Sequence, residues 1–122
     1  MPKKLIVVLA NTDPANPSEL GAPLAQASVA AAMGYEVEVI FTGRSGELAK
    51  KGVSARIQVP GSEPKTAYDF IQDGFEAGVL FKVCSPALAI WGDDLIPEIG
   101  EVVGSAYVIS EAMEGDTVTF TY

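Results

Sequence analysis

Residues 79–91 read VLFKVCSPALAIW, and they have the pattern of a strand followed directly by a helix. The first part of this stretch, up to Cys84, is a mostly aliphatic run of the length of one strand. Ser85 is a preferred N-cap residue and Pro86 a preferred first-turn residue, so we expect a short helix to complete the stretch. A buried strand that leads directly into a helix is typical of a parallel sheet. The stretch therefore predicts an α/β fold, with Cys84 just before a helix N-terminus.

Strands and helices are expected to alternate on both sides of this stretch. Apolar or alternating runs predict strands at residues 5–9, 35–42, 101–103 and 117–120, with a brief one at 57–59. Helices are expected at residues 24–33 and 105–114, with a third opening at residues 62–64 and a short one inside 43–52. The alternation implies βαβ units and hence a three-layer α/β sandwich around a parallel sheet, in a single domain over residues 1–122.

Three local features indicate where two helices begin and toward which side of the sheet the side chains of one strand point. Pro23 is expected to kink the first helix or to force a fresh start, because proline disrupts helix interiors. The alternating strand YEVEVIFT at 35–42 places Glu36 and Glu38 on the wetter side of the sheet. Ser105 is expected to cap the helix that follows it.

The composition removes several classes of chemistry. The 122 residues include no histidine and one cysteine, and 16 acidic against 8 basic side chains give a net charge of −8. Without histidine, His-dependent catalytic triads and Cys-His zinc sites are excluded. A lone cysteine excludes an internal disulfide and a CxxC redox pair. The acidic charge argues against nucleic acid or an anionic membrane surface as a partner.

Neither an anchor nor a cofactor motif is present in the sequence. No apolar stretch approaches the ~20 residues that span a bilayer, and an unpaired cysteine fits a reducing compartment, so we expect a cytoplasmic protein. No GxGxxG or phosphate-loop spacing occurs, and Asp93 and Asp94 lack the further ligands of a cation site. We therefore expect no cofactor and no metal.

Cys84 is the strongest candidate for chemistry. Parallel sheets bind ligands beyond the C-terminal ends of their strands. Three loops are expected there, at residues 11–13, 42–44 and 84–86. The N–H groups and the dipole of the helix that begins near Ser85 would stabilise a thiolate on Cys84. Lys82, two residues earlier, would add positive charge if its side chain shares that face.

Each candidate residue also has a structural explanation. Cys84 could be a small buried side chain of the core. Lys82 could form an ion pair or reach out past the end of the sheet. Asn11, Arg44 and Ser85 are further candidates for the rim of a substrate or anion site, although the basic cluster that includes Arg44 also fits a solvated helix face.

Two long segments carry a family resemblance. The first is VLFKVCSPALAIWG, which is followed by IPEIGEVVGSAYVISEAMEGDTVTFTY. The N-terminal half adds an apolar strand, the pair Asp13-Pro14, an alanine-rich helix and GYEVEVIFTG. In this order the features resemble the DsrE/DsrF-like family, with its YchN/DsrEFH-like fold, over essentially the whole chain. The resemblance implies a five-stranded parallel sheet between helix layers, with the strand at 79–84 internal.

The same resemblance implies a function and partners. In family members that act in sulfur relay, the cysteine that matches Cys84 carries sulfur as a persulfide and passes it to a partner. A sulfurtransferase-like carrier is therefore expected, with a sulfur donor or acceptor protein and a homo-oligomer, either a trimer or a hexamer. Two other functions stay open: a non-catalytic assembly or binding module with a structural cysteine, and a thiol redox sensor.

Overall fold

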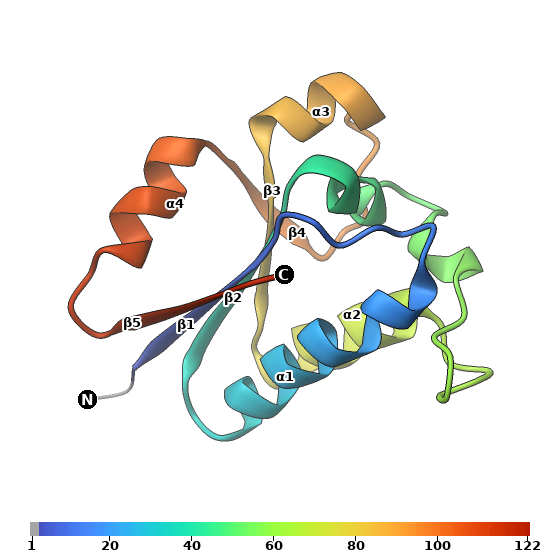
Figure 1. Ribbon diagram of the computed structural model, residues 1–122, viewed down its shortest axis with the longest axis horizontal. Helices are drawn as coiled ribbons and strands as arrows, with labels where there is room; N and C mark the ends of the chain where they lie inside the picture. The colour runs from blue at the N-terminus through green and yellow to red at the C-terminus, as the bar shows by residue number, and fades with distance from the viewer. Residues whose placement is uncertain (1–2) are drawn as a thin grey trace.

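Five parallel strands form one sheet in the computed structural model, which describes residues 3–122 (Figure 1). Their order across the sheet is β4-β3-β2-β1-β5. The strands are β1 Lys4–Leu9, β2 Glu36–Phe41, β3 Leu80–Cys84, β4 Ile99–Val103 and β5 Thr117–Thr121. The parallel pairing of every neighbouring pair and the internal position of β3 confirm the expected fold.

Helices lie on both faces of the sheet, which makes the fold three-layered. The α-helices are α1 Gly21–Ala32, α2 Ala67–Ala77, α3 Ser85–Trp91 and α4 Ser105–Ala112, and the 3-10 helices are η1 Pro17–Glu19, η2 Gly43–Ala49 and η3 Ser54–Arg56. Figure 1 shows α1 and α2 side by side on one face and α4 on the other. α3 continues from the end of β3 and packs against η2, so it lies at the C-terminal edge of the sheet.

The two faces of the sheet are packed differently. The face toward α1 and α2 is aliphatic and aromatic, and Phe41 and Phe81 stack there with ring centroids 5.9 Å apart. The face toward α4 has a smaller apolar cluster built on Ile6, Ile40 and Val103. The first face therefore holds most of the hydrophobic core.

Two helices start elsewhere than the sequence suggests. α1 starts afresh at Gly21, and Pro23 lies in its first turn, where a missing N–H removes no intrahelical bond. The expected start of α2 at 62–64 is wrong. The helix begins at Ala67, because Thr66 caps it and exchanges hydrogen bonds with Asp69, the third residue of the helix.

Two shorter expectations also need correction. Instead of a strand, residues 57–59 contribute an isolated bridge between Gln58 and Thr66. Ser105 is the first residue of α4, and Gly104 holds the cap position with extended backbone angles.

Glu38 is not on a wet face. It is 4% exposed, and it lies on the face of the sheet toward α4, where Tyr107 donates a hydrogen bond to it. The neighbouring strands supply the reason, because Lys4 on β1 and Lys82 on β3 pair with its carboxylate. A carboxylate with two cationic partners can be buried at an acceptable free-energy cost.

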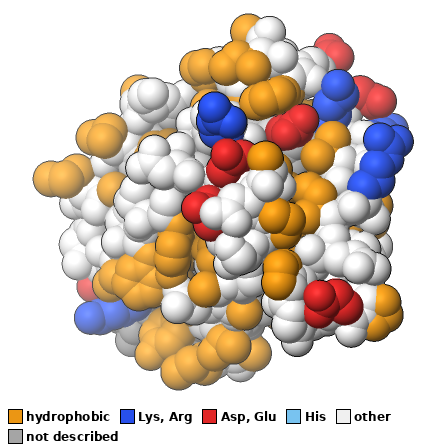
Figure 2. Space-filling view, turned by 45° about the vertical axis from the view of Figure 1, so that its right-hand side comes forward, with side chains coloured by type: hydrophobic (Ala, Val, Ile, Leu, Met, Phe, Trp, Pro, Cys, Tyr) orange, Lys and Arg blue, Asp and Glu red, His pale blue; other side chains and the backbone are white. Residues whose placement is uncertain are grey.

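The surface carries hydrophobic as well as charged side chains. Figure 2 shows groups of hydrophobic side chains on one face, with acidic and basic side chains between them. Within residues 3–122, no helix is long and apolar enough to cross a membrane.

Candidate functional site

Cys84 lies where β3 ends and α3 begins. It holds the N-cap position of α3 with extended backbone angles, and Ser85 is the first helical residue, which corrects the expectation that Ser85 caps the helix. Pro86 has no N–H, so Ser85 and Ala87 supply the free donors of this first turn. The side chain of Cys84 is almost buried, with 8% of the residue exposed.

Thr42 is the hydrogen-bond partner of the thiol. Cys84 Sγ donates to Thr42 Oγ1 over 2.9 Å, and Thr42 follows the end of the neighbouring strand β2. The buried hydroxyl of Ser45 fixes this turn, because its single O–H lies within hydrogen-bond distance of the carbonyls of Leu9 and Thr42 and its oxygen accepts from the N–H of Thr42. A hydroxyl can donate as well as accept, so Thr42 could donate to a thiolate on Cys84.

A hollow of about 210 Å³ opens beside the thiol, on the face of the sheet toward α4. Its lining combines apolar walls with two hydroxyls: Val8, Ile40, Thr42, Cys84, Ser105, Val108 and Ile109. The lining includes Ser105, the first residue of α4, so the N-terminus of this helix adjoins the hollow as well. The thiol therefore faces a small, mostly apolar space near the N-termini of two helices.

η2 holds α3 in place. A Cβ built on Gly46 would lie 2.6 Å from the Cβ of Ala87, so a side chain at position 46 would displace α3. Trp91 Nε1 donates to the carbonyl of Gly43 over 2.9 Å at the other end of α3. These contacts fix the helix that starts at Cys84.

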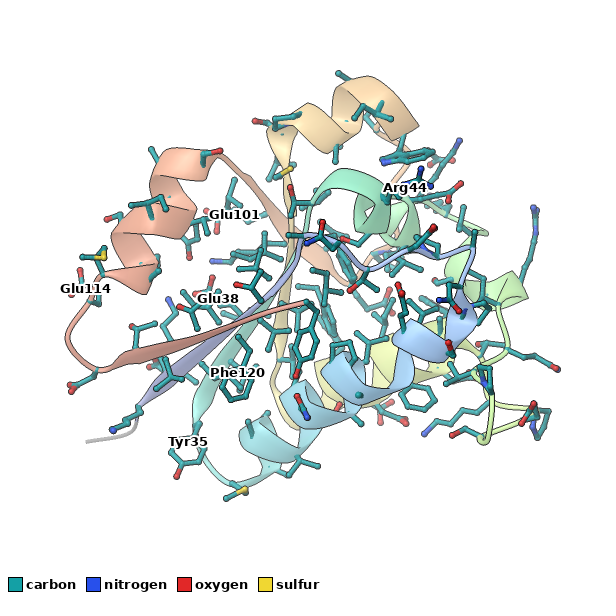
Figure 3. The ribbon with its side chains drawn as sticks, in the orientation of Figure 1. Tyr35, Glu38, Arg44, Glu101, Glu114 and Phe120 are labelled. Atoms are coloured by element: carbon teal, nitrogen blue, oxygen red, sulfur yellow. The ribbon has the colours of Figure 1, made fainter. Side chains whose placement is uncertain are left out.

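A charged network lies under α4, beside the hollow. Glu38 is its centre: one carboxylate oxygen is 2.5 Å from Lys4 Nζ, and the other is 3.0 Å from Lys82 Nζ. The hydroxyl of Tyr107 on α4 donates to Glu38 over 2.7 Å and accepts from Lys82 over 2.5 Å. Figure 3 shows Glu38 and Glu101 in the region between the sheet and α4.

Two further carboxylates complete this network. Glu101 on β4 is 3.0 Å from Lys82, and Glu111 on α4 is 2.5 Å from Lys4. The ammonium of Lys82 also lies 4.5 Å from the centre of the Tyr107 ring. The network thus links four strands to α4, and α4 is also one wall of the Cys84 hollow.

The contacts within the network shift the pKa values of its residues. Burial alone would raise the pKa of Glu38, but hydrogen bonds from Lys4, Tyr107 and Lys82 hold it below its usual value. Burial opposes the charge of Lys82, yet hydrogen bonds with Tyr107, Glu38 and Glu101 raise its pKa above the usual value. Burial, together with the hydrogen bond to Glu38, raises the pKa of Tyr107. The lysines and Glu38 are therefore charged, and Tyr107 neutral, near neutral pH.

The structure separates the remaining predicted site residues from the hollow. Lys82 points to the same face as Cys84, but its charge is taken up by Glu38 and Glu101. Ser85 is exposed. Asn11 is also exposed, and its backbone N–H donates to the carbonyl of Tyr122.

Arg44 lies far from the network in Figure 3 and is 72% exposed, 3.5 Å from the carboxylate of Asp13. Neither Asn11, Arg44, Lys82 nor Ser85 is among the residues that line the hollow.

Four residues of this region are not predicted as site residues from the sequence. Thr42 and Ser105 supply hydroxyls to the hollow, and Glu38 and Tyr107 connect the sheet to α4. One signal was available, because 42–44 is a loop at the edge where Cys84 lies. No comparable signal joins Tyr107 to Glu38, which lie 69 positions apart. Within residues 3–122, no three His, Cys, Asp or Glu side chains are grouped so as to hold a metal ion.

The fold has a solved counterpart. No protein-family model and no curated protein sequence matches the chain. The crystal structure of the YchN protein from E. coli is similar to it over 100% of both chains, with a TM-score of 0.76 and 19% sequence identity. At that identity the likeness concerns the fold, and it agrees with the resemblance seen in the sequence. The chain therefore has the DsrE/YchN-like fold.

Proposed function

We propose that this protein is a sulfur carrier that holds sulfane sulfur as a persulfide on Cys84. One observation carries the proposal: the single thiol of the chain ends an internal strand, begins a helix and opens on a hollow of about 210 Å³. This is the edge of a parallel sheet where ligands usually bind. The resemblance to the DsrE/DsrF-like family, whose fold the chain shares, supports the same chemistry.

Loading is a thiolate displacement. The Cys84 thiolate attacks the outer sulfur of a persulfide donor, R–S–SH, and a new S–S bond forms on Cys84. The S–S bond of the donor breaks, and its electron pair leaves with the donor as the thiolate RS⁻. The proton of the donor's S–H stays on the transferred sulfur, and the departing RS⁻ takes up the proton that Cys84 gives up when it ionises, so no oxidant or reductant is required.

The hollow has groups suited to hold the added sulfur. The Thr42 hydroxyl, 2.9 Å from Cys84 Sγ, can donate to a thiolate or to a persulfide anion. Ser105 and the first N–H groups of α4 lie around the same space. The apolar walls from Val8, Ile40 and Val108 would keep water away from the labile S–S bond.

Unloading repeats the displacement in reverse. A thiolate of an acceptor attacks the outer sulfur of Cys84–S–SH, and Cys84 leaves as a thiolate. We expect the donor and the acceptor to present cysteines on proteins, because Ile109 on the lining of the hollow is 63% exposed and suits a protein contact. A reducing compartment such as the cytoplasm would keep Cys84 unpaired between cycles. The family resemblance further suggests a trimeric or hexameric assembly.

Mass spectrometry under non-reducing conditions tests the loading step. The protein is incubated with a small-molecule persulfide, freed of donor and weighed intact. We expect the native chain to gain the mass of one sulfur atom, and dithiothreitol to remove it. Cys84→Ser should gain none. A native chain that gains no reducible sulfur from persulfide contradicts the proposal.

Two comparisons separate the carrier from a structural cysteine. Thr42→Val keeps the shape of the side chain but removes the hydroxyl, so we expect loading at least about ten-fold slower, the effect of losing one hydrogen bond to a charged group. Thr121→Val makes the same change on exposed β5 and should leave the rate unchanged. If iodoacetamide fails to modify native Cys84 at neutral pH, the cysteine is structural.

A further inference from the structure

The two edges of the sheet are protected to different degrees. The β4 edge carries Glu101, follows Pro97 and Glu98, and has a register irregularity in its pairing with β3. Charges, proline and irregular pairing are the usual means of preventing an open edge from pairing with another chain. The β5 edge has the sequence TVTFT at Thr117–Thr121, with no charge and no proline, and pairs with β1 in regular register.

The backbone of β5 has hydrogen-bonding groups directed outward. The carbonyl of Asp116 accepts from Lys4, and the N–H of Tyr122 donates to the carbonyl of Val8. Even-numbered residues of β5 therefore bond to β1. Because successive residues of a strand point their N–H and C=O groups to opposite sides, Thr117, Thr119 and Thr121 direct theirs to the open edge.

An apolar groove runs beside this edge. It has a volume of about 560 Å³ and lies between α1 and β5. Its lining includes the large exposed side chains Val29, Met33, Tyr35, Val118 and Phe120. Between 42% and 66% of each of these residues is exposed, an unusual gathering on a surface that faces water. Figure 3 shows Phe120 and Tyr35 toward the same end of the molecule.

We propose that a second copy of this chain covers this edge, by pairing its β5 antiparallel to the first across a two-fold axis at Thr119. The three outward-facing residues then hydrogen-bond in register, with Thr119 opposite the partner's Thr119 and Thr117 opposite the partner's Thr121. The sheet becomes continuous through both copies. The pairing is independent of the chemistry at Cys84, which lies beyond β1 and β2 in the sheet order.

Self-complementarity favours a second copy over another occupant. In this register Val118 lies opposite the partner's Phe120, as a non-hydrogen-bonded pair whose side chains approach closely. Both side chains lie on the groove side of the sheet, so the two grooves join across the axis. Although each chain carries a net charge of −8, β5 itself is uncharged, so no like charges face each other along the paired strands.

Engineered cysteines test the register. In the Cys84→Ser background, Thr119→Cys places two thiols on the axis with Cα atoms about 5.5 Å apart, within the range of a disulfide. Thr117→Cys is the matched control on the same face of β5, and its two copies lie more than about 13 Å apart. After mild oxidation we expect a disulfide-linked dimer for Thr119→Cys and none for Thr117→Cys. Equal cross-linking of both variants, or of neither, overturns the proposal.

The mass in solution supplies a second test. By light scattering at tens of micromolar protein, we expect an even number of chains for the native protein, which agrees with the hexamer but not with the trimer that the family resemblance suggests. Thr119→Pro removes the outward N–H without removing a bond to β1 and should halve that number, while Thr119→Ala should not change it. Circular dichroism checks that both variants fold. A native monomer, or a trimer, overturns the proposal, and so does an unchanged mass for folded Thr119→Pro.

Discussion

The two faces of the sheet bury different kinds of side chain. Toward α1 and α2, the sheet contributes an apolar core in which Phe41 and Phe81 stack. Toward α4, the same strands carry buried charges centred on Glu38, and the thiol of Cys84 opens on a hollow. Apolar packing needs only volume and shape, whereas the α4 face needs each polar group to meet its partner. The face toward α4 is therefore the one where polar side chains lie beside the thiol of Cys84.

Removing a ring from the apolar face should have the largest effect on stability. Phe81→Ala deletes half of the stacked pair and leaves a cavity beneath α2, near Gly74. We expect the free energy of unfolding in urea to fall by about 4 kcal/mol. Phe75→Ala, at a half-exposed position of α2, is the matched control and should cost less than about 1 kcal/mol. Similar losses for both variants would show that the core is not on this face.

Glu38→Gln removes the central carboxylate of the charged network under α4 and should have a smaller effect on stability. Lys82 keeps Glu101 as a partner and Lys4 keeps Glu111, so the loss is partial. We expect the free energy of unfolding, measured by the same urea titration, to fall by about 2 kcal/mol. Glu101→Gln removes a carboxylate that is 58% exposed and should cost less than about 1 kcal/mol. If the two variants cost the same, Glu38 is not the centre of the network.

Acid should remove the contribution that the Glu38 carboxylate makes to the stability of the fold. Its pKa is held below the usual 4.5 in the folded chain, so its contribution is present above that pH and is lost as pH falls below it. The difference in melting temperature between the native chain and Glu38→Gln should stay constant at neutral pH and narrow in acid. A difference that widens below pH 4.5 would contradict the pKa shift.

Tyr107→Phe should have a smaller effect on stability than Glu38→Gln and a clear effect on the reactivity of the Cys84 thiol. It removes the hydroxyl that joins Glu38 and Lys82 to α4, but keeps the ring over Lys82. We expect the free energy of unfolding to fall by about 1 kcal/mol. Because α4 is a wall of the Cys84 hollow, looser attachment should speed alkylation of Cys84 in the folded protein.

Glu114→Gln, an exposed change just beyond the end of α4, is the control for this prediction. It should leave both stability and alkylation unchanged. An alkylation rate that Tyr107→Phe does not alter would mean that the network does not govern access to the thiol.

Much of the fold is readable from the sequence because it depends on local patterns. The apolar run of β1, the alternation of β2 and the strand-to-helix junction at Cys84 each lie within one short segment. The cap of α2 was readable too, since Thr66 and Asp69 have the spacing of a capping box. Local spacing thus predicts elements well and their first residues less well.

The partners on the α4 face depend on contacts between distant residues. Glu38 reads as a solvated residue of an alternating strand until β1 and β3 bring Lys4 and Lys82 to either side. Thr42 meets Cys84 across 42 positions. Strand order and helix placement determine such pairs, and no local pattern encodes them. The position of Cys84 between a strand and a helix could therefore be predicted from the sequence, but the side chains around it could not.

If the thiol of Cys84 carries sulfur, one experiment should show both its loading and its discharge. The protein is loaded with a persulfide donor, freed of donor, and mixed with a reduced acceptor thiol, while intact mass is followed. We predict that one sulfur atom appears on Cys84, is absent from Cys84→Ser, and moves to the acceptor while the free thiol returns. A chain that takes up no sulfur, or keeps it in the presence of the acceptor, would contradict the account.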